Sequence, residues 1–309
     1  MSGPSTSRVH AVVVTYQPEM TVLSKLLDSL AAQVERLLIV DNTPGEDRLS
    51  ETLAGAYPND LVQLIRLGRN TGIGYALNVG IAEARKAGAT HVLLSDQDSL
   101  PAADMVDRLL HAAAAMAAMG RVVGAVGPTY TDIHTGITYP FQVERQGRLF
   151  YGHQRPSDEQ PIVQALTLIT SGTLVPMHVL DVIGPMREDF FIDQVDIEWC
   201  HRARAKGFEL FGVGNAVMFH QMGEHALRVW YFGWRKESAY SPLRVYYRIR
   251  NFVALCREKG IPLGWKLRSS WYSAGFVYSQ VIFGRQRVAA LRMALMGLWD
   301  GVVGRMGSR

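Results

Sequence analysis

The sequence has few cysteines, no apolar run long enough to cross a membrane and no recognisable secretion signal. Its two cysteines, Cys200 and Cys256, stand far apart among 309 residues, which excludes a disulfide framework and indicates a reducing compartment. The best candidate for a membrane span, 16 uncharged residues between Arg268 and Arg285, contains four serines. It is shorter than the roughly 18–20 apolar residues that a spanning helix needs. No charged segment followed by an apolar one opens the chain, so we expect an intracellular protein.

Two glycine-rich nucleotide motifs are also missing. A dinucleotide site needs G-x-G-x-x-G directly after the first strand, but residues 12–20 read VVVTYQPEM. Gly72-Ile73-Gly74 is followed by Leu77 where the third glycine would stand, and no Gly-Lys-Ser/Thr of a P-loop occurs. Hydride chemistry is therefore disfavoured. We expect these glycines to allow close backbone approach to neighbouring elements or to a ligand.

Positive charge and tryptophan are concentrated in the tail. Residues 226–309 carry 15 Lys and Arg against three acidic residues, a net +12, so the first 225 residues carry −8. Five of the six tryptophans lie in the same segment. This composition is typical of helices on an anionic membrane surface, but helices whose aromatic side chains cover the main domain share it. No nucleic-acid-binding module accompanies the charge, so we expect no nucleic-acid partner.

Short apolar runs alternate with segments of helical period in the first 225 residues. The runs 9–14, 36–40, 61–65, 91–94 and 122–126 indicate strands, and 21–33, 73–87 and 102–119 indicate helices. This alternation predicts an α/β fold with a mostly parallel sheet flanked by helices, in which ligands bind beyond the carboxyl ends of the strands. We expect one domain over residues 1–225 and a basic, aromatic, helical tail over residues 226–309.

Polar residues directly follow four of these strands. They are Thr15-Tyr16, Asp41-Asn42-Thr43, Arg69-Asn70-Thr71-Gly72 and Asp96-Gln97-Asp98. Parallel strands end at the same edge of a sheet, so these groups should meet on one rim. Two carboxylates at i and i+2 can bind a divalent cation that bridges to phosphate oxygens, although alone this pattern is equally typical of a solvated turn. The four strand ends together favour a nucleoside-diphosphate site.

A second acidic cluster lies in residues 190–207, FFIDQVDIEWCHRARAKG. Glu198 stands four residues before Arg202, which favours a structural ion pair on a helix. Asp193 is a candidate N-cap for this helix. Asp196 has no basic partner at i+4 and lies in the first helical turn after an aromatic loop, so it is the candidate general base.

Two further positions have both a structural and a functional interpretation. His220 ends the apolar run GNAVMFH and is either a packed or capping residue or, together with Asp98, a metal ligand. Ser171-Gly172 follows the apolar run QALTLIT and is either a plain turn or a hydroxyl and close backbone approach to a substrate.

As an ordered set, these motifs resemble the inverting glycosyltransferases of family two. The set is T-Y, D-N-T, N-T-G-I-G-Y-A-L-N-V-G-I, D-Q-D, S-G, F-I-D-Q-V-D-I-E-W-C-H-R and then His220, and it lies within residues 1–225. Within the family, LLSDQDS, FFIDQVDIEW, the stretch from Tyr246 to Asn251 and the ending GLWDG are similar to bacterial rhamnosyltransferases of surface polysaccharide and rhamnolipid synthesis.

The resemblance implies a GT-A fold, a nucleotide-sugar donor and a set of site residues. The donor nucleotide would be held by Thr15, Tyr16, Asp41, Asn70, Gly74, Asp96 and Gln97, and Mg²⁺ or Mn²⁺ by Asp96, Asp98 and His220. Asp196 matches the catalytic base, although Val195 replaces the glutamate that precedes it in most members, which leaves Asp193 as a candidate second acid. The candidates on the acceptor side are Ser171, Gly172, Asp193 and Trp199.

The function that follows is inverting transfer of L-rhamnose from dTDP-β-L-rhamnose to a hydroxyl of a lipid-linked glycan or glycolipid, giving an α-L-rhamnoside. The basic tail would hold a cytoplasmic enzyme against the inner membrane as a peripheral protein. Two alternatives remain: transfer from another nucleotide sugar such as a UDP-sugar, and non-catalytic binding of a nucleotide sugar, against which Asp196 argues. A sugar-phosphate nucleotidyltransferase is disfavoured because no glycine-rich, basic loop follows the first strand. The oligomeric state has no signature in the sequence.

Overall fold

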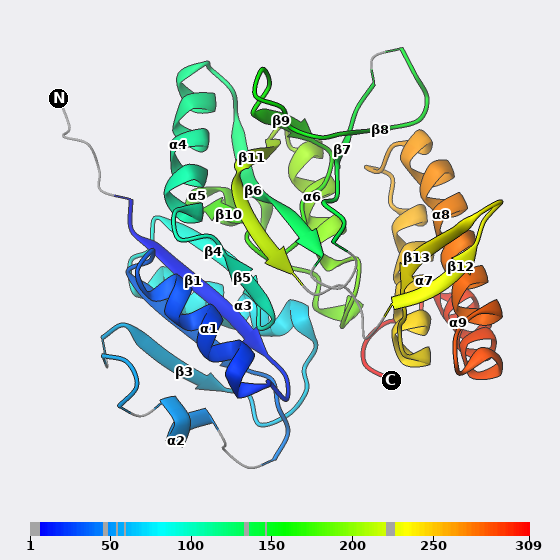
Figure 1. Cartoon of the computed structure of the whole chain (residues 1–309), viewed down its shortest axis with the longest axis horizontal. Helices are drawn as coiled ribbons and strands as arrows, with labels where there is room; N and C mark the ends of the chain where they lie inside the picture. The colour runs from blue at the N-terminus through cyan, green and yellow to red at the C-terminus, as the bar shows by residue number, and fades with distance from the viewer. Residues whose placement is uncertain are drawn as a thin grey trace.

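The computed structural model of the chain describes residues 7–45, 49–53, 55–58, 60–132, 136–145, 147–220 and 226–309. Within these residues, nine strands form the central sheet, in the order β3-β2-β1-β4-β10-β6-β11-β5 with β9 paired to β11 (Figure 1). The strands of this sheet are β1 (Val9–Thr15), β2 (Arg36–Asp41), β3 (Val62–Arg66), β4 (His91–Asp96), β5 (Ser99–Pro101), β6 (Val123–Asp132), β9 (Ile162–Ala165), β10 (Leu174–Pro176) and β11 (Glu209–His220).

The sheet is mostly parallel, as predicted. β1 pairs in parallel with β2 and β4, β2 with β3, and β11 with β6. The short β10 lies antiparallel between β4 and β6, and both β5 and β9 pair antiparallel with β11. β10 could not be predicted because its three residues are too few to display a periodicity.

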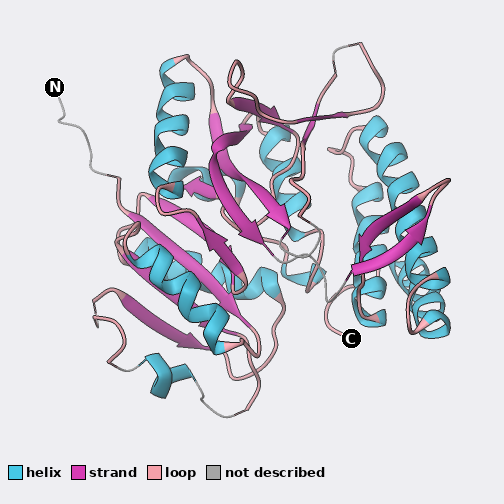
Figure 2. Ribbon diagram, viewed as in Figure 1, coloured by secondary structure: helices cyan, strands magenta, loops and turns pink. Residues whose placement is uncertain are grey.

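Helices cover both faces of the sheet (Figure 2). One buried cluster joins the sheet to α1 (Met20–Ala31), α2 (Leu49–Leu53) and α4 (Met105–Ala118). A second cluster joins the opposite face to α3 (Ile73–Lys86), α5 (Met177–Ile183) and α6 (Val195–Ala205), with the short 3-10 helix η1 (Glu188–Phe190) between the last two. In β1, Val9, Ala11 and Val13 belong to the first cluster, whereas Val12 and Val14 belong to the second. Burial on both faces explains the uninterrupted apolar run of this strand.

The tail forms a helical layer beside the sheet domain (Figure 1). It contains α7 (Pro242–Arg257), α8 (Leu263–Ile282) and α9 (Arg287–Val303), preceded by the antiparallel hairpin of β12 (Ala226–Trp230) and β13 (Trp234–Ser238). A second small antiparallel pair, β7 (Phe141–Val143) and β8 (Gly152–Gln154), lies in the sheet domain. No helix in the described ranges has both the length and the apolar character needed to span a membrane.

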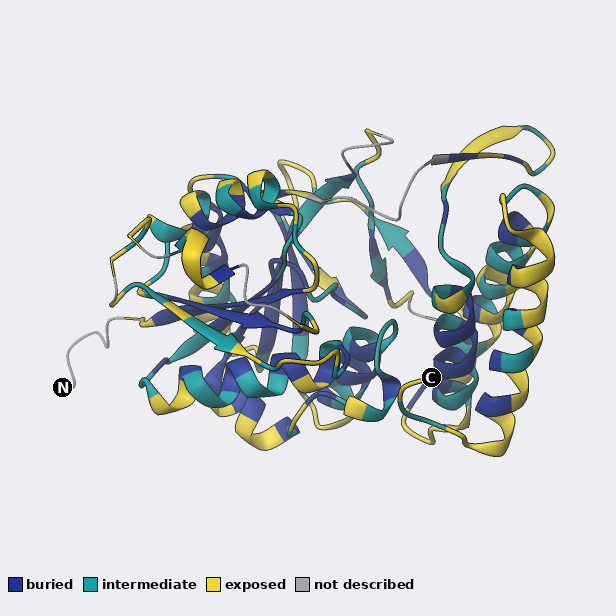
Figure 3. Cartoon of the chain, turned by 90° about the horizontal axis from the view of Figure 1, so that it is seen from below, coloured by how far each residue is buried: buried dark blue, intermediate teal, exposed yellow. Residues whose placement is uncertain are grey.

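The tail combines a packed side with an exposed one. Phe252, Leu255 and Trp265 belong to the same buried cluster as α3 and α6, and Trp265 donates its indole N–H to Gln142 Oε1 at 3.2 Å. The outer faces of α8 and α9 are exposed (Figure 3), with Trp271 81% and Trp299 61% exposed. Both interpretations of the basic, aromatic composition therefore have a counterpart, on opposite sides of the layer. The domain boundary after residue 225 stays a prediction.

Candidate functional site

The carboxyl ends of β1, β2 and β4 bring the predicted nucleotide residues together. In the parallel register, Thr15 lies beside Asp41, and Val14 lies beside Asp96. Thr15 Oγ1 donates to Asp41 Oδ1 at 3.2 Å, and both residues are buried. Asp41 Oδ1 also accepts the N–H of Thr43 at 3.1 Å. The Asp41 carboxylate is thus fixed at the rim by one hydroxyl and one backbone donor.

Gln97 joins the loops after β1 and β4. Its Oε1 accepts the N–H of Tyr16 at 2.7 Å, and its Nε2 donates to the carbonyl of Tyr16 at 3.1 Å. These two hydrogen bonds tie the Tyr16 backbone to the Asp96-Gln97-Asp98 turn. The Tyr16 side chain is 44% exposed. An exposed aromatic ring held on a fixed backbone at this rim can stack on a nucleobase.

Asn70 reaches the rim through Asn42, which was expected on this rim but without an assigned role. Asn42 Nδ2 donates to Asn70 Oδ1 at 3.1 Å, and Asn42 Oδ1 accepts the N–H of Thr71 at 2.7 Å. Asn42 is buried, so it orders the turn that leads into α3. Its signal in the sequence was its position directly after Asp41 at a strand end.

Gly74 has a packing reason for lacking a side chain. A Cβ atom there would lie 2.4 Å from the carbonyl oxygen of Arg187, and one at Gly72 would lie 2.6 Å from that of Phe191. The start of α3 therefore abuts the segment that leads to α6. This is the close approach to a neighbouring element that the sequence analysis expected, and a contact of Gly74 with the donor stays a prediction.

The Asp96-Gln97-Asp98 turn lies next to the end of β11. Ser99 pairs with His220 in the antiparallel register of β5 and β11, which brings the His220 backbone within one residue of Asp98. The side chain of His220 lies outside the described part of the structure, so its predicted role as ligand stays a prediction. No group of three or more His, Cys, Asp and Glu side chains suited to a metal ion occurs among the described residues.

The chemistry of this turn nevertheless fits a hard divalent cation. Asp96 and Asp98 supply carboxylate oxygens, and Mg²⁺ is commonly bound by one or two carboxylates together with substrate phosphates and water. Such a site is completed by the ligand that it binds, so two carboxylates from the protein are sufficient for it. A third protein ligand of the His220 type would suit Mn²⁺.

Ser171 and Gly172 form hydrogen bonds at the end of β4 and the start of the Asp96-Gln97-Asp98 turn. Ser171 is fully buried, its Oγ accepts the N–H of Asp96 at 3.0 Å, and it forms a short hydrogen bond with Ser99 Oγ. Gly172 has a φ of 80° and donates its N–H to Leu94 O at 2.8 Å. The two residues thus lie beside the carboxylate turn, just before β10. An acceptor contact of either residue stays untested.

Asp196 lies in the first turn of α6, as predicted, with its carboxylate held by backbone groups. Oδ1 accepts the N–H of Ile197 at 2.8 Å, and Oδ2 accepts that of Thr170 at 3.3 Å. Burial, aided by repulsion from Asp96 and Asp193, raises the pKa of Asp196 to about 6, against the opposing effect of the two N–H donors. A carboxylate with this pKa is a stronger proton acceptor than an ordinary aspartate and is still ionised at neutral pH.

Asp193 is engaged in an ion pair with the tail. Arg244 of α7 donates to Asp193 from Nη2 at 3.0 Å and from Nε at 3.4 Å. The charge of Asp193 raises the pKa of Arg244, and the charge of Asp96 contributes in the same direction. The guanidinium therefore lies within electrostatic range of the carboxylate turn. The N-cap of α6 is Gln194, without a side-chain cap bond, so the prediction that Asp193 caps this helix is wrong.

Two further residues of α6, Glu198 and Trp199, are buried. Trp199 is 2% exposed and belongs to the main buried cluster, which corrects the expectation that it faces the acceptor. The reason is that Trp199 follows Asp196 by three residues on the side of α6 that packs on the sheet. Glu198 pairs with Arg202 at 2.9 Å, which confirms the predicted structural ion pair.

Several residues near the site escaped the sequence analysis. Tyr130 is one: burial, together with the charges of Tyr139, Asp196 and Tyr240, raises its pKa, so it lies within electrostatic range of the candidate base. Arg244 is another, and no local pattern distinguishes it from the other basic residues of the tail. The only signal for this region was the Tyr246 to Asn251 stretch that contributed to the family resemblance.

The fold is that of glycosyltransferases of the GT-A class. Residues 11–162 match the model of glycosyl transferase family 2. The chain thus carries a glycosyl transferase family 2 domain and is a glycosyltransferase, which confirms the family inferred from the motifs.

Relatives of known identity support this assignment. The dTDP-rhamnosyl transferase RfbF of Shigella flexneri is 28% identical over 306 residues, which span 97% of each chain. Among solved structures, GalNAc-T7 with UDP, GalNAc and Mn²⁺ has a TM-score of 0.62 at 13% identity, over 97% of this chain and 56% of its own. TarS 1–349 of S. aureus with UDP-GlcNAc has a TM-score of 0.56 at 16% identity, over 96% of this chain and 80% of its own. At these identities the two structures establish a shared fold, and this chain spans little more than half of GalNAc-T7.

Proposed function

We propose that the protein transfers L-rhamnose from dTDP-β-L-rhamnose, with inversion, to a hydroxyl of a lipid-linked glycan or glycolipid. The observation that carries the proposal is the Asp196 carboxylate, which stands in the first turn of α6 within electrostatic range of Asp96 and has a pKa raised to about 6. A base and a diphosphate-binding turn on one rim are what a single displacement at a sugar carbon requires. The choice of sugar is supported by the relation to RfbF along 97% of the chain.

In the proposed reaction, Thr15, Tyr16, Asp41 and Asn70 hold the nucleoside, and Asp96, Asp98 and His220 hold Mg²⁺ or Mn²⁺. A divalent cation at this place offsets the negative charge that develops on the departing diphosphate. Asp196 takes the proton of the acceptor hydroxyl while that oxygen forms the bond to the anomeric carbon. The bond from this carbon to the diphosphate oxygen breaks with its electron pair on the diphosphate. Attack from the opposite face converts the β-linked donor into an α-L-rhamnoside.

Arg244 adds positive charge on the tail side of this site. Its ion pair with Asp193 orients the guanidinium, and Asp96 contributes to its raised pKa. A guanidinium is always charged and donates hydrogen bonds in a planar fork that matches phosphate oxygens. We assign Arg244 to stabilisation of the diphosphate leaving group, with Asp193 as the residue that orients it.

The exposed side of the tail supports a peripheral membrane location. On α8 and α9, Trp271 and Trp299 are exposed, and Arg285, Arg287 and Arg292 lie on the same two helices and the turn between them. Aromatic rings enter the headgroup region while arginines pair with anionic lipids, each contributing about 1 kcal/mol near the surface. This arrangement would bring the site to lipid-linked acceptors.

The first test is release of nucleoside diphosphate from dTDP-, UDP- and GDP-sugars, with Mg²⁺, Mn²⁺ or a chelator. We expect metal-dependent turnover of dTDP-rhamnose, and its loss in Asp98→Ala. Turnover of a UDP-sugar alone would show that the donor is a UDP-sugar and not dTDP-rhamnose. Donor binding by calorimetry without turnover, in the presence of bacterial lipid extract as acceptor, would favour the non-catalytic alternative, and absence of binding to all donors would refute the proposal.

A further inference from the structure

The loop that leads into α6 has an unusual backbone. Phe191, Asp193 and Gln194 have φ angles of 65°, 64° and 66°, in the left-handed region that residues with a side chain rarely adopt. Such conformations persist where the surrounding structure imposes them, and they concentrate at functional sites. Asp193, which binds Arg244, lies in this loop, and Asp196 stands two residues after its end. We refer to residues 189–194 as the base loop.

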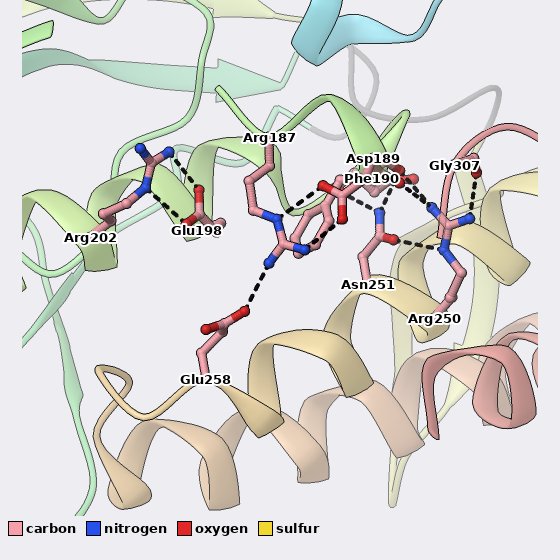
Figure 4. A network of polar contacts seen from close by, with 10 residues as sticks. Arg187, Asp189, Phe190, Glu198, Arg202, Arg250, Asn251, Glu258 and Gly307 are labelled. Atoms are coloured by element: carbon pink, nitrogen blue, oxygen red, sulfur yellow. Dashed lines mark hydrogen bonds and ion pairs between the residues drawn. The ribbon is translucent and has the colours of Figure 1, made fainter. Parts of the chain in front are cut away.

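Two side chains of α7 hold the carbonyl groups of the base loop (Figure 4). Asn251 Nδ2 lies within hydrogen-bond distance of the carbonyls of Phe190, Ile192 and Asp193, at 2.9, 2.8 and 2.9 Å. Arg250 Nη2 donates to Phe190 O at 2.9 Å and to Asp189 O at 3.2 Å. Arg250 Nε in turn donates to Asn251 Oδ1 at 3.0 Å, which fixes the orientation of the amide. Of the five carbonyls from Asp189 to Asp193, all but that of Phe191 thus accept hydrogen bonds from this pair of side chains.

The start of α3 and the last residues of the tail also form hydrogen bonds with the base loop. Phe191 O accepts the N–H of Ile73 at 2.6 Å, at the start of α3, and the Phe191 ring stacks on Tyr247 of α7 at 4.9 Å. Gly307 donates its N–H to Asp189 O at 2.7 Å, and its own carbonyl accepts from Arg250 Nη1. The base loop is therefore held between the start of α3 and the last residues of the tail.

We propose that Arg250 and Asn251 are positioning residues, which hold the base loop in the conformation that sets Asp193 against Arg244 and starts α6 at Val195, one residue before Asp196. The inference rests on the proposed role of Asp196 as the base. Arg250 is 1% exposed and Asn251 is fully buried. Burial of a guanidinium and an amide is costly, and apolar residues would anchor a helix equally well. Their presence in the interior is explained by these carbonyls, which lie in η1 and in the irregular turn before α6 and need hydrogen-bond donors there.

The test compares isosteric changes at the pair with a change elsewhere on α7. Asn251→Asp keeps the shape and the bond from Arg250 but removes the donors to the loop, and Arg250→Lys keeps the charge but removes the fork. The matched control is Tyr246→Phe, which removes the buried bond from Tyr246 to Asp300 Oδ2 at 2.8 Å and leaves every contact with the base loop intact. Hydrogen exchange of residues 188–195 and steady-state kinetics, with kcat expressed per dTDP-binding site from calorimetry, are measured for all four proteins.

We expect exchange in the base loop to rise about tenfold or more in Asn251→Asp and Arg250→Lys, since buried bonds are lost. Because misplacement by about 1 Å costs on the order of 100-fold in rate, kcat per site should fall by this factor while KM for the donor stays within about twofold. Tyr246→Phe should change neither quantity. Unchanged exchange, or kcat per site no lower than in the control, would overturn the inference. If the wild type does not turn over, the proposed function fails, and the exchange data alone still decide whether the pair holds the loop.

Discussion

Replacing Asp196 by asparagine separates the catalytic role of this residue from its effect on stability. The pKa of Asp196 is raised from 3.8 to about 6 in the folded protein, chiefly by burial. The folded state therefore binds this proton more tightly than the unfolded state, and stability falls as pH rises from about 4 to about 6. The difference of about two pH units corresponds to about 3 kcal/mol of lost stability at pH 7.5, at 1.36 kcal/mol per unit.

Asp196→Asn removes the destabilising effect of the buried charge, but it also removes one hydrogen-bond acceptor. The carboxylate accepts N–H bonds from Ile197 and Thr170 on separate oxygens, and an asparagine can keep only one of them. The lost bond costs about 1 kcal/mol, so the variant should be about 2 kcal/mol more stable than wild type at pH 7.5. Well below pH 4 the carboxyl is protonated in both states of the wild type, so only the lost bond remains and the variant should be about 1 kcal/mol less stable than wild type.

Two assays check these values. Chemical denaturation at pH 4, 6 and 7.5 gives the difference in unfolding free energy, and kcat/KM between pH 5 and 8 gives the acidic limb. We expect the limb near pH 6 in wild type and a loss of turnover of about 100- to 10,000-fold in Asp196→Asn, the range for general bases. Glu198→Gln on the same helix is the control, because it breaks the pair with Arg202 and should leave the limb in place. A limb below about pH 4.5, or a variant less stable than wild type at pH 7.5, would refute the reasoning.

Three further changes test other parts of the molecule. Ser171→Ala removes the acceptor for the Asp96 N–H, so Mn²⁺ affinity measured by calorimetry in the presence of dTDP should weaken about tenfold, and unchanged affinity would contradict the support role. Gly74→Ala places a Cβ 2.4 Å from Arg187 O and should lower the unfolding free energy by about 1–3 kcal/mol in urea, whereas a neutral effect would show that the contact relaxes freely. Trp271→Glu combined with Trp299→Glu should reduce co-sedimentation with anionic vesicles at least about tenfold without changing thermal stability, because both rings are exposed, and undiminished binding would exclude this face as the membrane contact.

The rim of the site was predictable because its determinants are local. Thr15, Asp41 and Asp96 each end a short apolar run, and the alternation of strands and helices makes those runs parallel neighbours. Asp196 was predictable for a similar reason: helical spacing showed that it has no basic partner one turn later. The structure adds the contacts between these residues, such as Thr15 with Asp41, which depend on strand register.

The parts that could not be predicted depend on contacts between distant segments. Ser171 reaches Asp96 across 75 residues, and Asn251 reaches the base loop across about 60. Burial also reverses expectations at Trp199, since spacing on α6 identifies a face of the helix but not which face meets the sheet. A turn such as Ser171-Gly172 has the same composition whether it faces solvent or supports another loop.

The charge of the tail illustrates why composition alone was ambiguous. Arg244 and Arg250 turn toward the sheet domain, where they bind the Asp193 carboxylate and the carbonyls of the base loop. Arg285 lies in the turn between α8 and α9, and Arg287 is the first residue of α9, so neither is on α7, the helix that contacts the base loop. Because α7 lies between the base loop and the outer helices, a single basic segment can supply cations to the reaction and to a lipid surface on opposite sides. The net charge of +12 therefore includes arginines that face the sheet domain and arginines that face away from it, and this difference depends on how α7 packs.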